Sequence, residues 1–250
     1  MIENGNETMM KMEHTDIQGI PALVIGEEAR EAYLFVHGKM GYKEEAAAFA
    51  EVACPAGFQV VGIDLPEHGA RKGSEEKLLP WTAVPELRAV YRAMRERWQR
   101  VSVRANSIGA WLSMLALQNE DAAKALFVSP VVDMENLIGN MMTWAGVTEE
   151  ELERRGEIPT GFGETLSWNY LCWVREHPVR WRTPTEILYG KKDDLTPRSV
   201  IEAFAAERGC GLTVMEGGEH WFHTEEQLRF LRAWEEKTVQ GSMSAEEPKR

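Results

Sequence analysis

A serine, an aspartate and a histidine stand where together they could cleave an ester bond. Ser107 lies in the stretch RANSIGA, Asp193 in GKKDDLTP and His220 in GGEH. A serine hydroxyl is a poor nucleophile at neutral pH. The chemistry therefore also needs a base, an acid that orients the base, and hydrogen-bond donors for the charge that develops on the substrate oxygen. These three residues are candidates for nucleophile, acid and base.

The residues around Ser107 predict a sharp turn between a strand and a helix. Residues 101–105 have the pattern of a strand, residues 108–117 that of a buried helix, and Gly109 follows the serine by two positions. Small neighbours let the chain bend tightly and project the hydroxyl above a sheet. Serine and glycine at this spacing also occur in ordinary turns and helix caps, so the strand and helix on either side support the interpretation more than the pair does.

Four motifs resemble, in their order along the chain, those of α/β-hydrolases of the small esterase and lysophospholipase-like type. They are FVHGKMG at residues 35–41, DLPEHG at 64–69, the turn at Ser107, and the acid and base segments. The resemblance covers nearly the whole chain and the order serine, aspartate, histidine is that of the family. The family usually has glycine two residues before the serine, where this chain has Ala105. Alanine is the smallest side chain with a Cβ, so a tight turn stays feasible.

The resemblance assigns a role to each candidate. His220 would take the proton from Ser107 and later give it to the leaving group, while a buried carboxylate holds the imidazole in one tautomer. Asp193 is the preferred carboxylate because it has the family's spacing from the preceding glycine and the following proline. Asp194 is the nearest alternative, and Asp133 is a second, since some family members place the acid there.

Backbone N–H groups are expected to form the oxyanion hole. The resemblance implies that these belong to Ile108, directly after the nucleophile, and Lys39, just past the His-Gly pair. Neither role depends on the side chain. His37 and His68 are expected to organise loops by hydrogen bonding.

The elements that must position these residues follow from the apolar pattern. From residue 32 onward short apolar runs alternate with amphipathic stretches, which predicts a mostly parallel sheet flanked by helices on both faces, the α/β-hydrolase fold. The candidate strands are residues 32–36, 59–63, 101–105, 125–129, 186–189 and 212–215. An antiparallel pair at residues 10–15 and 21–25 is expected to precede them.

Helix signals occur at several places between these strands. Apolar residues recur at three- or four-residue spacing from Thr82 onward, which predicts a helix with one buried face. Thr196 is expected to cap a helix with Pro197 at its first position. Thr224 and Gln227 have the spacing of a capping box and predict the start of a final helix.

A helical cap is expected after the sixth strand, at residues 133–184. This segment is too long for a simple crossover, and its Thr148 and Glu151 form another capping-box pattern. Its aromatic residues would suit an apolar or aromatic substrate group, although they would equally serve to pack the cap onto the domain. The candidate substrate-binding residues are Trp144, Trp168, Trp173 and, beside the histidine, Trp221.

Size and composition predict a single domain spanning residues 1–250, with residues 241–250 as a flexible tail. The chain starts with neither the basic nor the apolar segment of a secretory signal, and it has no apolar run that could span a bilayer. We therefore expect a soluble cytoplasmic protein with no membrane span. The formal charge of −12 disfavours nucleic acid as a partner.

No cofactor or metal is implied by the sequence. The three cysteines are widely separated and fit reduced thiols, no His/Asp/Glu cluster has zinc spacing, and no glycine-rich phosphate loop is present.

The leading hypothesis is a serine hydrolase that cleaves carboxylic esters through an acyl-serine intermediate on Ser107. Its partner would be a small-molecule ester or acyl substrate, with thioesters as a variant of the same chemistry. A second hypothesis is a serine aminopeptidase-like amide hydrolase, in which acidic cap residues such as Glu149, Glu150, Glu151 and Glu164 receive the amino terminus of a short peptide. A third is a non-catalytic protein that binds a small ligand on the same fold. The sequence leaves acyl-chain preference and oligomeric state open.

Overall fold

A computed structural model describes residues 10–241 of the chain. The polar amino-terminal residues 1–9 and nearly all of the tail predicted at 241–250 lie outside the described residues.

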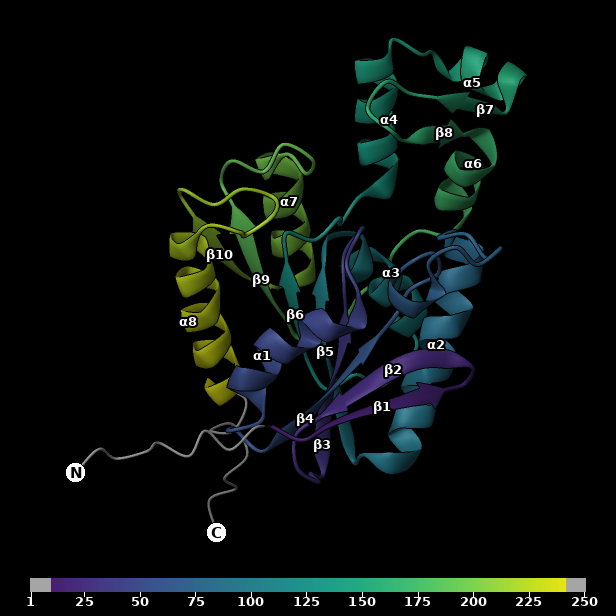
Figure 1. The fold of residues 1–250 in the computed structure, drawn as a ribbon. Coiled ribbons are helices and arrows are strands. Elements are labelled where there is room, and N and C mark those ends of the chain that lie inside the picture. The colour runs from purple at the N-terminus through teal and green to yellow at the C-terminus, as the bar shows by residue number, and fades with distance from the viewer. Residues whose placement is uncertain (1–9, 242–250) are drawn as a thin grey trace, which may run out of the picture.

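An eight-stranded sheet forms the centre of the molecule (Figure 1). Its strands follow the order β1-β2-β4-β3-β5-β6-β9-β10, and all neighbouring pairs from β4 to β10 are parallel, whereas β2 is antiparallel to both β1 and β4. The bounds are β1 Met12–Ile17, β2 Ile20–Ile25, β3 Glu31–Val36, β4 Phe58–Ile63, β5 Arg100–Asn106, β6 Ala125–Val128, β9 Thr185–Gly190 and β10 Gly211–Met215. This arrangement confirms the predicted fold class.

The strands β1 and β2 join through a tighter turn than the sequence pattern indicated. Ile17 pairs directly with Ile20, so the turn has only two central residues, Gln18 and Gly19. Both have positive φ, 57° and 79°, as a type I′ hairpin turn requires. The turn matches the right-handed twist of the two strands, which is why this short connection is favoured.

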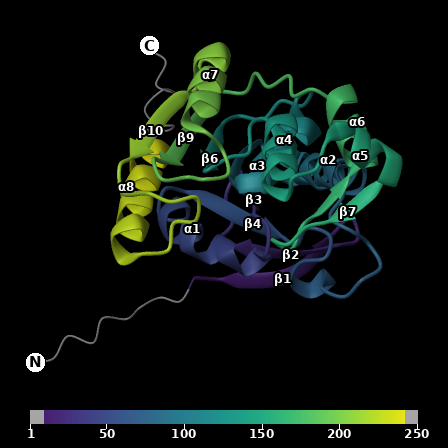
Figure 2. The ribbon, with the colours of Figure 1, turned by 90° about the horizontal axis from the view of Figure 1, so that it is seen from above.

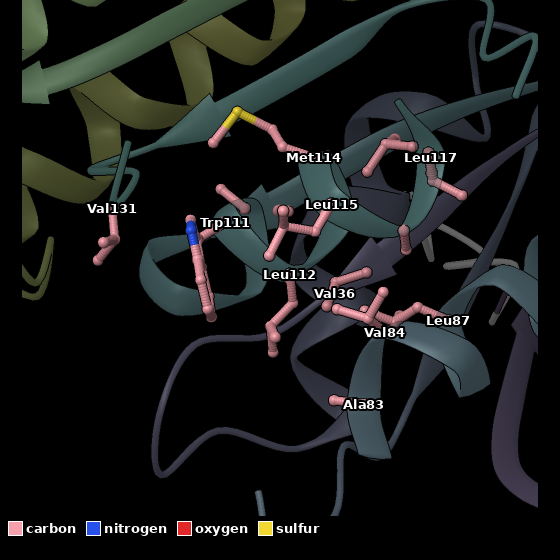
Figure 3. Packing of buried hydrophobic residues seen from close by; sticks show 14 of the residues in the cluster. Val36, Ala83, Val84, Leu87, Trp111, Leu112, Met114, Leu115, Leu117 and Val131 are labelled. Carbon is pink, nitrogen blue, oxygen red and sulfur yellow. The ribbon is translucent and has the colours of Figure 1, made fainter. Parts of the chain in front are cut away.

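Helices cover both faces of the sheet (Figure 2). One face carries α2, α3 and α7, whose apolar side chains share a core cluster with the central strands. The other face carries α1 and α8. The bounds are α1 Ala46–Ala53, α2 Pro80–Arg97, α3 Ser107–Leu117, α7 Arg198–Arg208 and α8 Glu225–Gly241, with short 3-10 turns η1 Lys43–Glu45 and η2 Gly69–Arg71. Figure 3 shows Leu112 and Leu115 of α3 beside Val84 of α2 in the first cluster.

Two helix starts differ from the sequence-based expectation, and α1 is not among the elements that the pattern predicted. Helix α2 begins at Pro80, before Thr82. Helix α7 is capped by Pro197 and has no side-chain cap, so the prediction that Thr196 caps it was wrong. The Thr196 hydroxyl is instead directed at the Pro130 carbonyl, to which it donates at 3.4 Å. Its backbone N–H donates to Asp193 Oδ1 at 3.0 Å.

The capping box predicted for the last helix is confirmed. The Gln227 N–H donates to Thr224 Oγ1 at 3.3 Å, and the Thr224 N–H donates to Gln227 Oε1 at 3.4 Å. This start fixes where the chain turns from the loop that carries His220 into α8.

The cap lies between β6 and β9 and stands beyond the carboxyl ends of the parallel strands (Figure 1). It contains a two-stranded antiparallel hairpin besides the predicted helices. Thr148 caps α5, accepting the Glu151 N–H at 3.2 Å. The cap elements are α4 Met134–Ala145, α5 Glu149–Arg155, β7 Glu157–Pro159, β8 Thr165–Ser167 and α6 Trp168–Glu176. Within residues 10–241, no helix combines the length and apolar character needed to cross a bilayer.

Candidate active site

Ser107 lies at the junction between β5 and α3. The strand ends at Asn106 with extended backbone, φ −110° and ψ 139°, and the helix begins at Ser107 itself. Ser107 has a φ of 49°, in the left-handed region that residues with a Cβ seldom adopt. Backbone in this region is strained and persists only where its surroundings hold it. The chain therefore turns sharply at the serine, as a nucleophile elbow requires.

Two glycines let the loop after β3 pack against this turn. A Cβ at Gly109 would lie 2.3 Å from the His37 carbonyl oxygen, so no other residue fits there without a shift. A Cβ at Gly38 would lie 3.3 Å from the Ser107 Cβ. Ala105, which replaces the family's usual glycine, is fully buried in β5 and causes no break in the pairing of that strand.

The three candidate residues form one hydrogen-bonded path. Ser107 Oγ lies 2.8 Å from His220 Nε2, and His220 Nδ1 lies 2.7 Å from Asp193 Oδ2. Because the carboxylate accepts the proton on Nδ1, Nε2 is left as an acceptor for the serine hydroxyl. This arrangement can remove the proton from Ser107.

Asp193 is held firmly in this path. Its side chain is fully buried, and its second oxygen accepts the N–H groups of Leu195 and Thr196 at 2.9 and 3.0 Å. Together with His220, three donors thus satisfy the carboxylate, as a buried charge requires. The backbone bonds fix the direction from which the carboxylate meets the imidazole.

The loops that carry the acid and the base are joined through their backbones. The Lys192 N–H donates to the Gly218 carbonyl at 2.8 Å. Gly190 and Gly218 face each other, and a Cβ at Gly190 would lie 2.5 Å from the Glu219 carbonyl oxygen. The two glycines therefore allow an approach that brings Asp193 within reach of the histidine.

The two alternative acids lie elsewhere. Asp194 is exposed. Asp133 is also exposed and caps α4, accepting the Asn136 N–H at 2.9 Å. Of the three aspartates considered, only Asp193 has a hydrogen bond with His220 in the described structure.

A neutral histidine organises the loop that contains Lys39. His37 is completely buried, and its Nε2 accepts the Leu65 N–H at 3.1 Å, so the ring proton must be on Nδ1. Nδ1 donates to the Gly38 carbonyl at 2.7 Å. Burial lowers the pKa of His37 from 6.5 to about 4, which keeps the ring neutral. The Gly38 carbonyl and the Lys39 N–H belong to one planar peptide and point in opposite directions, so His37 fixes the orientation of that N–H.

Further contacts fasten this loop on two sides. The Met40 N–H donates to His68 Nε2 at 2.9 Å, and His68 Nδ1 donates to the Pro66 carbonyl at 2.7 Å. The Lys39 side chain forms an ion pair with Glu164 of the cap. The loop that contains Lys39 thus contacts both the loop after β4 and the cap. The sequence pattern did not indicate the contact with Glu164.

Two candidate substrate-binding tryptophans lie at the start and in the last part of α6. Trp173 stacks on His177 with ring centroids 4.0 Å apart and meets Trp111 of α3 edge-on at 6.2 Å. Trp168 is half-buried and packs against the main core cluster. Trp173 therefore joins the cap to the α/β core.

The other two tryptophans present open faces. Trp144 is 51% exposed and makes an edge contact with Phe162, also of the cap, at 6.1 Å. Trp221, directly after the candidate base, is 74% exposed and stacks on His223. Their exposure leaves both available to a ligand.

A cavity of about 440 Å³ lies between the cap and α7, outside the hydrogen-bonded path. Neither Ser107 nor His220 lines it. Its apolar lining comes from Trp111, Val132, Met134, Val174, Val200 and Phe204.

Within the described part of the chain, no three His, Cys, Asp or Glu side chains are grouped to hold a metal ion. The three cysteines are half-buried and form no disulfide, and burial raises the pKa of Cys54 to about 11, which keeps it a thiol.

Comparison with known proteins identifies the family and the fold. The model of the alpha/beta hydrolase family matches residues 33–233. No curated protein sequence matched the chain.

Several solved structures share the fold. Est1E from Butyrivibrio proteoclasticus superposes with a TM-score of 0.75 at 19% identity, covering 93% of this chain and 99% of that one. Mouse alpha/beta hydrolase domain-containing protein 10 gives 0.68 at 14% identity, covering 92% and 99%. The Pyrococcus furiosus esterase Pf2001 gives 0.67 at 15% identity, covering 94% and 91%.

Proposed function

The chain belongs to the α/β-hydrolase family, and from this premise we propose that it is a serine hydrolase cleaving carboxylic esters through an acyl-Ser107 intermediate. The observation that carries the proposal is the path from Ser107 through His220 to the buried Asp193. A hydroxyl paired with a correctly oriented neutral imidazole is an activated nucleophile.

In the first half of the reaction Ser107 Oγ attacks the ester carbonyl carbon while His220 Nε2 takes the hydroxyl proton. Asp193 stabilises the imidazolium that results. The carbonyl oxygen becomes an oxyanion, for which the N–H groups of Ile108 and Lys39 are the proposed donors. Collapse of the tetrahedral intermediate breaks the bond to the alcohol oxygen, and His220 gives its proton to the departing alcohol.

In the second half a water molecule attacks the acyl-serine, and His220 takes a proton from that water. The acyl carbon passes through a second tetrahedral intermediate. Ser107 Oγ then leaves, recovers the proton from His220, and the carboxylic acid is released.

The exposed aromatic side chains of the cap and of Trp221 support an apolar or aromatic substrate group. Trp144, Phe162 and Trp221 are exposed large apolar residues on the cap and beside His220. The Est1E structure contains ferulic acid, and another structure of the same fold is a thioesterase domain from the curacin biosynthetic pathway, with a TM-score of 0.54. Aryl esters are therefore the first substrates to test, and thioesters the second.

The peptidase alternative requires a free acidic group to receive an amino terminus. Three of the four acidic cap residues considered for this role already have cationic partners: Glu149 pairs with Arg175 at 2.6 Å, Glu151 with Arg155, and Glu164 with Lys39. This pairing favours ester substrates over short peptides.

Labelling with a fluorophosphonate probe tests the nucleophile. We expect the wild-type protein to be labelled and Ser107→Ala to lose all labelling, because an activated serine oxygen displaces fluoride from the phosphorus of the probe and forms a phosphonyl-serine. Ser113→Ala removes another serine of the same helix and should label normally. Labelling that persists in Ser107→Ala would reject the proposed nucleophile, and a wild-type protein that resists the probe would favour the non-catalytic ligand-binding alternative.

Substrate class is tested separately. We expect p-nitrophenyl esters, compared over increasing acyl length, to have a higher kcat/KM than aminoacyl amides of the same acyl group. The reverse preference would replace the esterase proposal with the aminopeptidase-like one.

A further inference from the structure

An arginine is buried in the central strand, three positions before the serine. The Arg104 side chain is 3% exposed, and its Nε donates to Glu235 Oε1 at 2.8 Å. Glu235 belongs to α8 and is 6% exposed. The guanidinium also lies over the rings of Phe35 and Phe49, with its carbon 5.6 and 5.8 Å from their centroids.

The same guanidinium binds the two residues that precede Ser107. Its Nη1 donates to Asn106 Oδ1 at 2.6 Å and to the Ala105 carbonyl at 3.2 Å. Arg104 therefore connects the terminal helix to the last two residues of β5. The planar guanidinium has several N–H donors in fixed directions, so it can hold these acceptors together, which a lysine ammonium could not do with the same geometry.

Stability alone does not account for this buried pair. Removing both charges from water is expensive, and apolar residues of similar volume in place of such a pair are often neutral or stabilising. What apolar residues could not supply is the pair of directed hydrogen bonds at Ala105 and Asn106. These bonds lie immediately before the strained φ of Ser107, where backbone must be held by its surroundings.

We propose that Arg104, anchored by Glu235, is a positioning residue that holds Asn106 and thereby the backbone turn that presents Ser107. This inference rests on the proposed function of Ser107. Asn106 also lies against residues 37–41, the proposed oxyanion loop, because a Cβ at Gly38 would be 3.6 Å from the Asn106 Cβ. Fixing Asn106 thus affects both the nucleophile and the loop that carries Lys39.

A second carboxylate lies within the electrostatic reach of Arg104. Burial raises the pKa of Glu45, and a hydrogen bond with the Tyr42 backbone and then the charge of Arg104 oppose that rise. The Glu45 carboxylate is close to the oxyanion loop, since a Cβ at Gly41 would lie 2.8 Å from Glu45 Oε1. Arg104 therefore acts electrostatically on a carboxylate beside that loop, in addition to its hydrogen bonds to the elbow and to the terminal helix.

The test separates positioning from stability by comparing Arg104→Met with the double variant Arg104→Met/Glu235→Leu. The single variant leaves a buried carboxylate unpaired and should lower the Tm, whereas the double variant should recover most of it. Both should react with the fluorophosphonate at least about tenfold more slowly than wild type, because a small misplacement of a reacting group has effects of this size. For ester hydrolysis we expect the loss in kcat, with KM changed less than about threefold.

Arg71→Met/Glu86→Leu is the matched control. Arg71 is 8% exposed and pairs with Glu86 at 2.7 Å, and none of its hydrogen bonds reaches residues 104–107. Its replacement should change the Tm but not the labelling rate. A wild-type labelling rate in Arg104→Met/Glu235→Leu would overturn the proposal, since the pair would then serve stability alone.

A crystal structure of Arg104→Met/Glu235→Leu decides the point without any activity. We expect the Asn106 side chain and the Ser107 backbone to depart from their present conformations. An unchanged Asn106 rotamer and Ser107 φ in this variant would refute the positioning role. An unreactive Ser107 in the wild-type protein is a different result: it would reject the proposed function and leave the structural test of positioning in place.

Discussion

Asp193 differs from the two alternative acids, Asp194 and Asp133, in its hydrogen-bond partners. It accepts two backbone N–H groups and the imidazole, whereas Asp194 faces solvent and Asp133 caps α4. We predict that Asp193→Asn lowers kcat for ester hydrolysis by about 10³–10⁴-fold, because an amide in this position favours the wrong histidine tautomer. The measurement is steady-state kinetics on a p-nitrophenyl ester.

The matched controls are the other two aspartates. Asp194→Asn should leave kcat within a factor of about two, since surface substitutions change little. Asp133→Ala should lower the free energy of unfolding by about 1 kcal/mol through the lost helix cap, without a large change in kcat. A greater loss of kcat in either control than in Asp193→Asn would move the acid role.

His37 should make stability depend on pH. Its pKa is about 4 in the folded chain and 6.5 when unfolded, so between these values the unfolded chain binds more protons. Its contribution is therefore fully present above pH 6.5 and is lost as pH falls toward 4, by up to about 1.4 kcal/mol per unit. Urea unfolding at pH 7, 6 and 5 measures this slope.

A His37→Gln variant should have a shallower slope over this range, and His14→Gln, at an exposed position of β1, should keep the wild-type slope. If the free energy of unfolding had the same pH dependence in wild type and His37→Gln, the His37 ring would not have the lowered pKa.

At the scale of elements, an ion pair links the cap to the loop of residues 38–41. Lys39 and Glu164 are 50% and 39% exposed, and such pairs contribute only about 0–1 kcal/mol. We predict that Glu164→Gln leaves the Tm nearly unchanged but increases hydrogen exchange in the β7–β8 hairpin and in residues 38–41. The Tm should stay nearly unchanged because each segment has other contacts that hold it in the fold. Hydrogen exchange should increase because the ion pair that joins the two segments is lost.

Glu202→Gln is the control, because Glu202 forms an equally exposed pair with Arg198 on α7, away from the cap hairpin. It should leave exchange at the hairpin unchanged. If Glu164→Gln does not alter exchange in either segment, the ion pair has no part in holding the cap to the loop.

At the scale of the whole molecule, the net charge of −12 sets up a field that acts on charged substrates before they bind. We predict that kcat/KM for an anionic ester rises with added NaCl, that it falls for a cationic ester, and that it stays constant for a neutral ester of the same acyl group. Screening of long-range charge is the cause. A common trend for all three esters would point to an effect of salt on the protein itself.

The sequence indicated the strands of the sheet and their positions along the chain because each strand is encoded locally, whereas their order within the sheet is set by tertiary contacts. Each parallel strand is a short apolar run bounded by turn residues, and such runs need no knowledge of distant contacts. The same holds for the capping box at Thr224 and Gln227. Helix α1 was missed, and Thr196 was assigned to a helix cap although its hydroxyl is directed at the Pro130 carbonyl, a contact with a distant segment.

For the site, the sequence supplied candidate residue types and the family order. Their catalytic roles remain predictions, but the structure brings Ser107, Asp193 and His220 into one path and leaves Asp194 outside it. The family's spacing favoured Asp193 over the adjacent Asp194, but only the folded loop shows which of the two side chains turns inward.

Arg104 shows the remaining limit most clearly. An arginine inside an apolar strand signals a buried charge that needs a partner, and the sequence contains that signal. The partner, Glu235, is 131 positions away and is otherwise one of several glutamates in an amphipathic helix. Local residue types and spacing thus determined the fold class and the candidate nucleophile. Only the tertiary structure decided the partners, because contacts between distant segments depend on how sheet, helices and loops pack together.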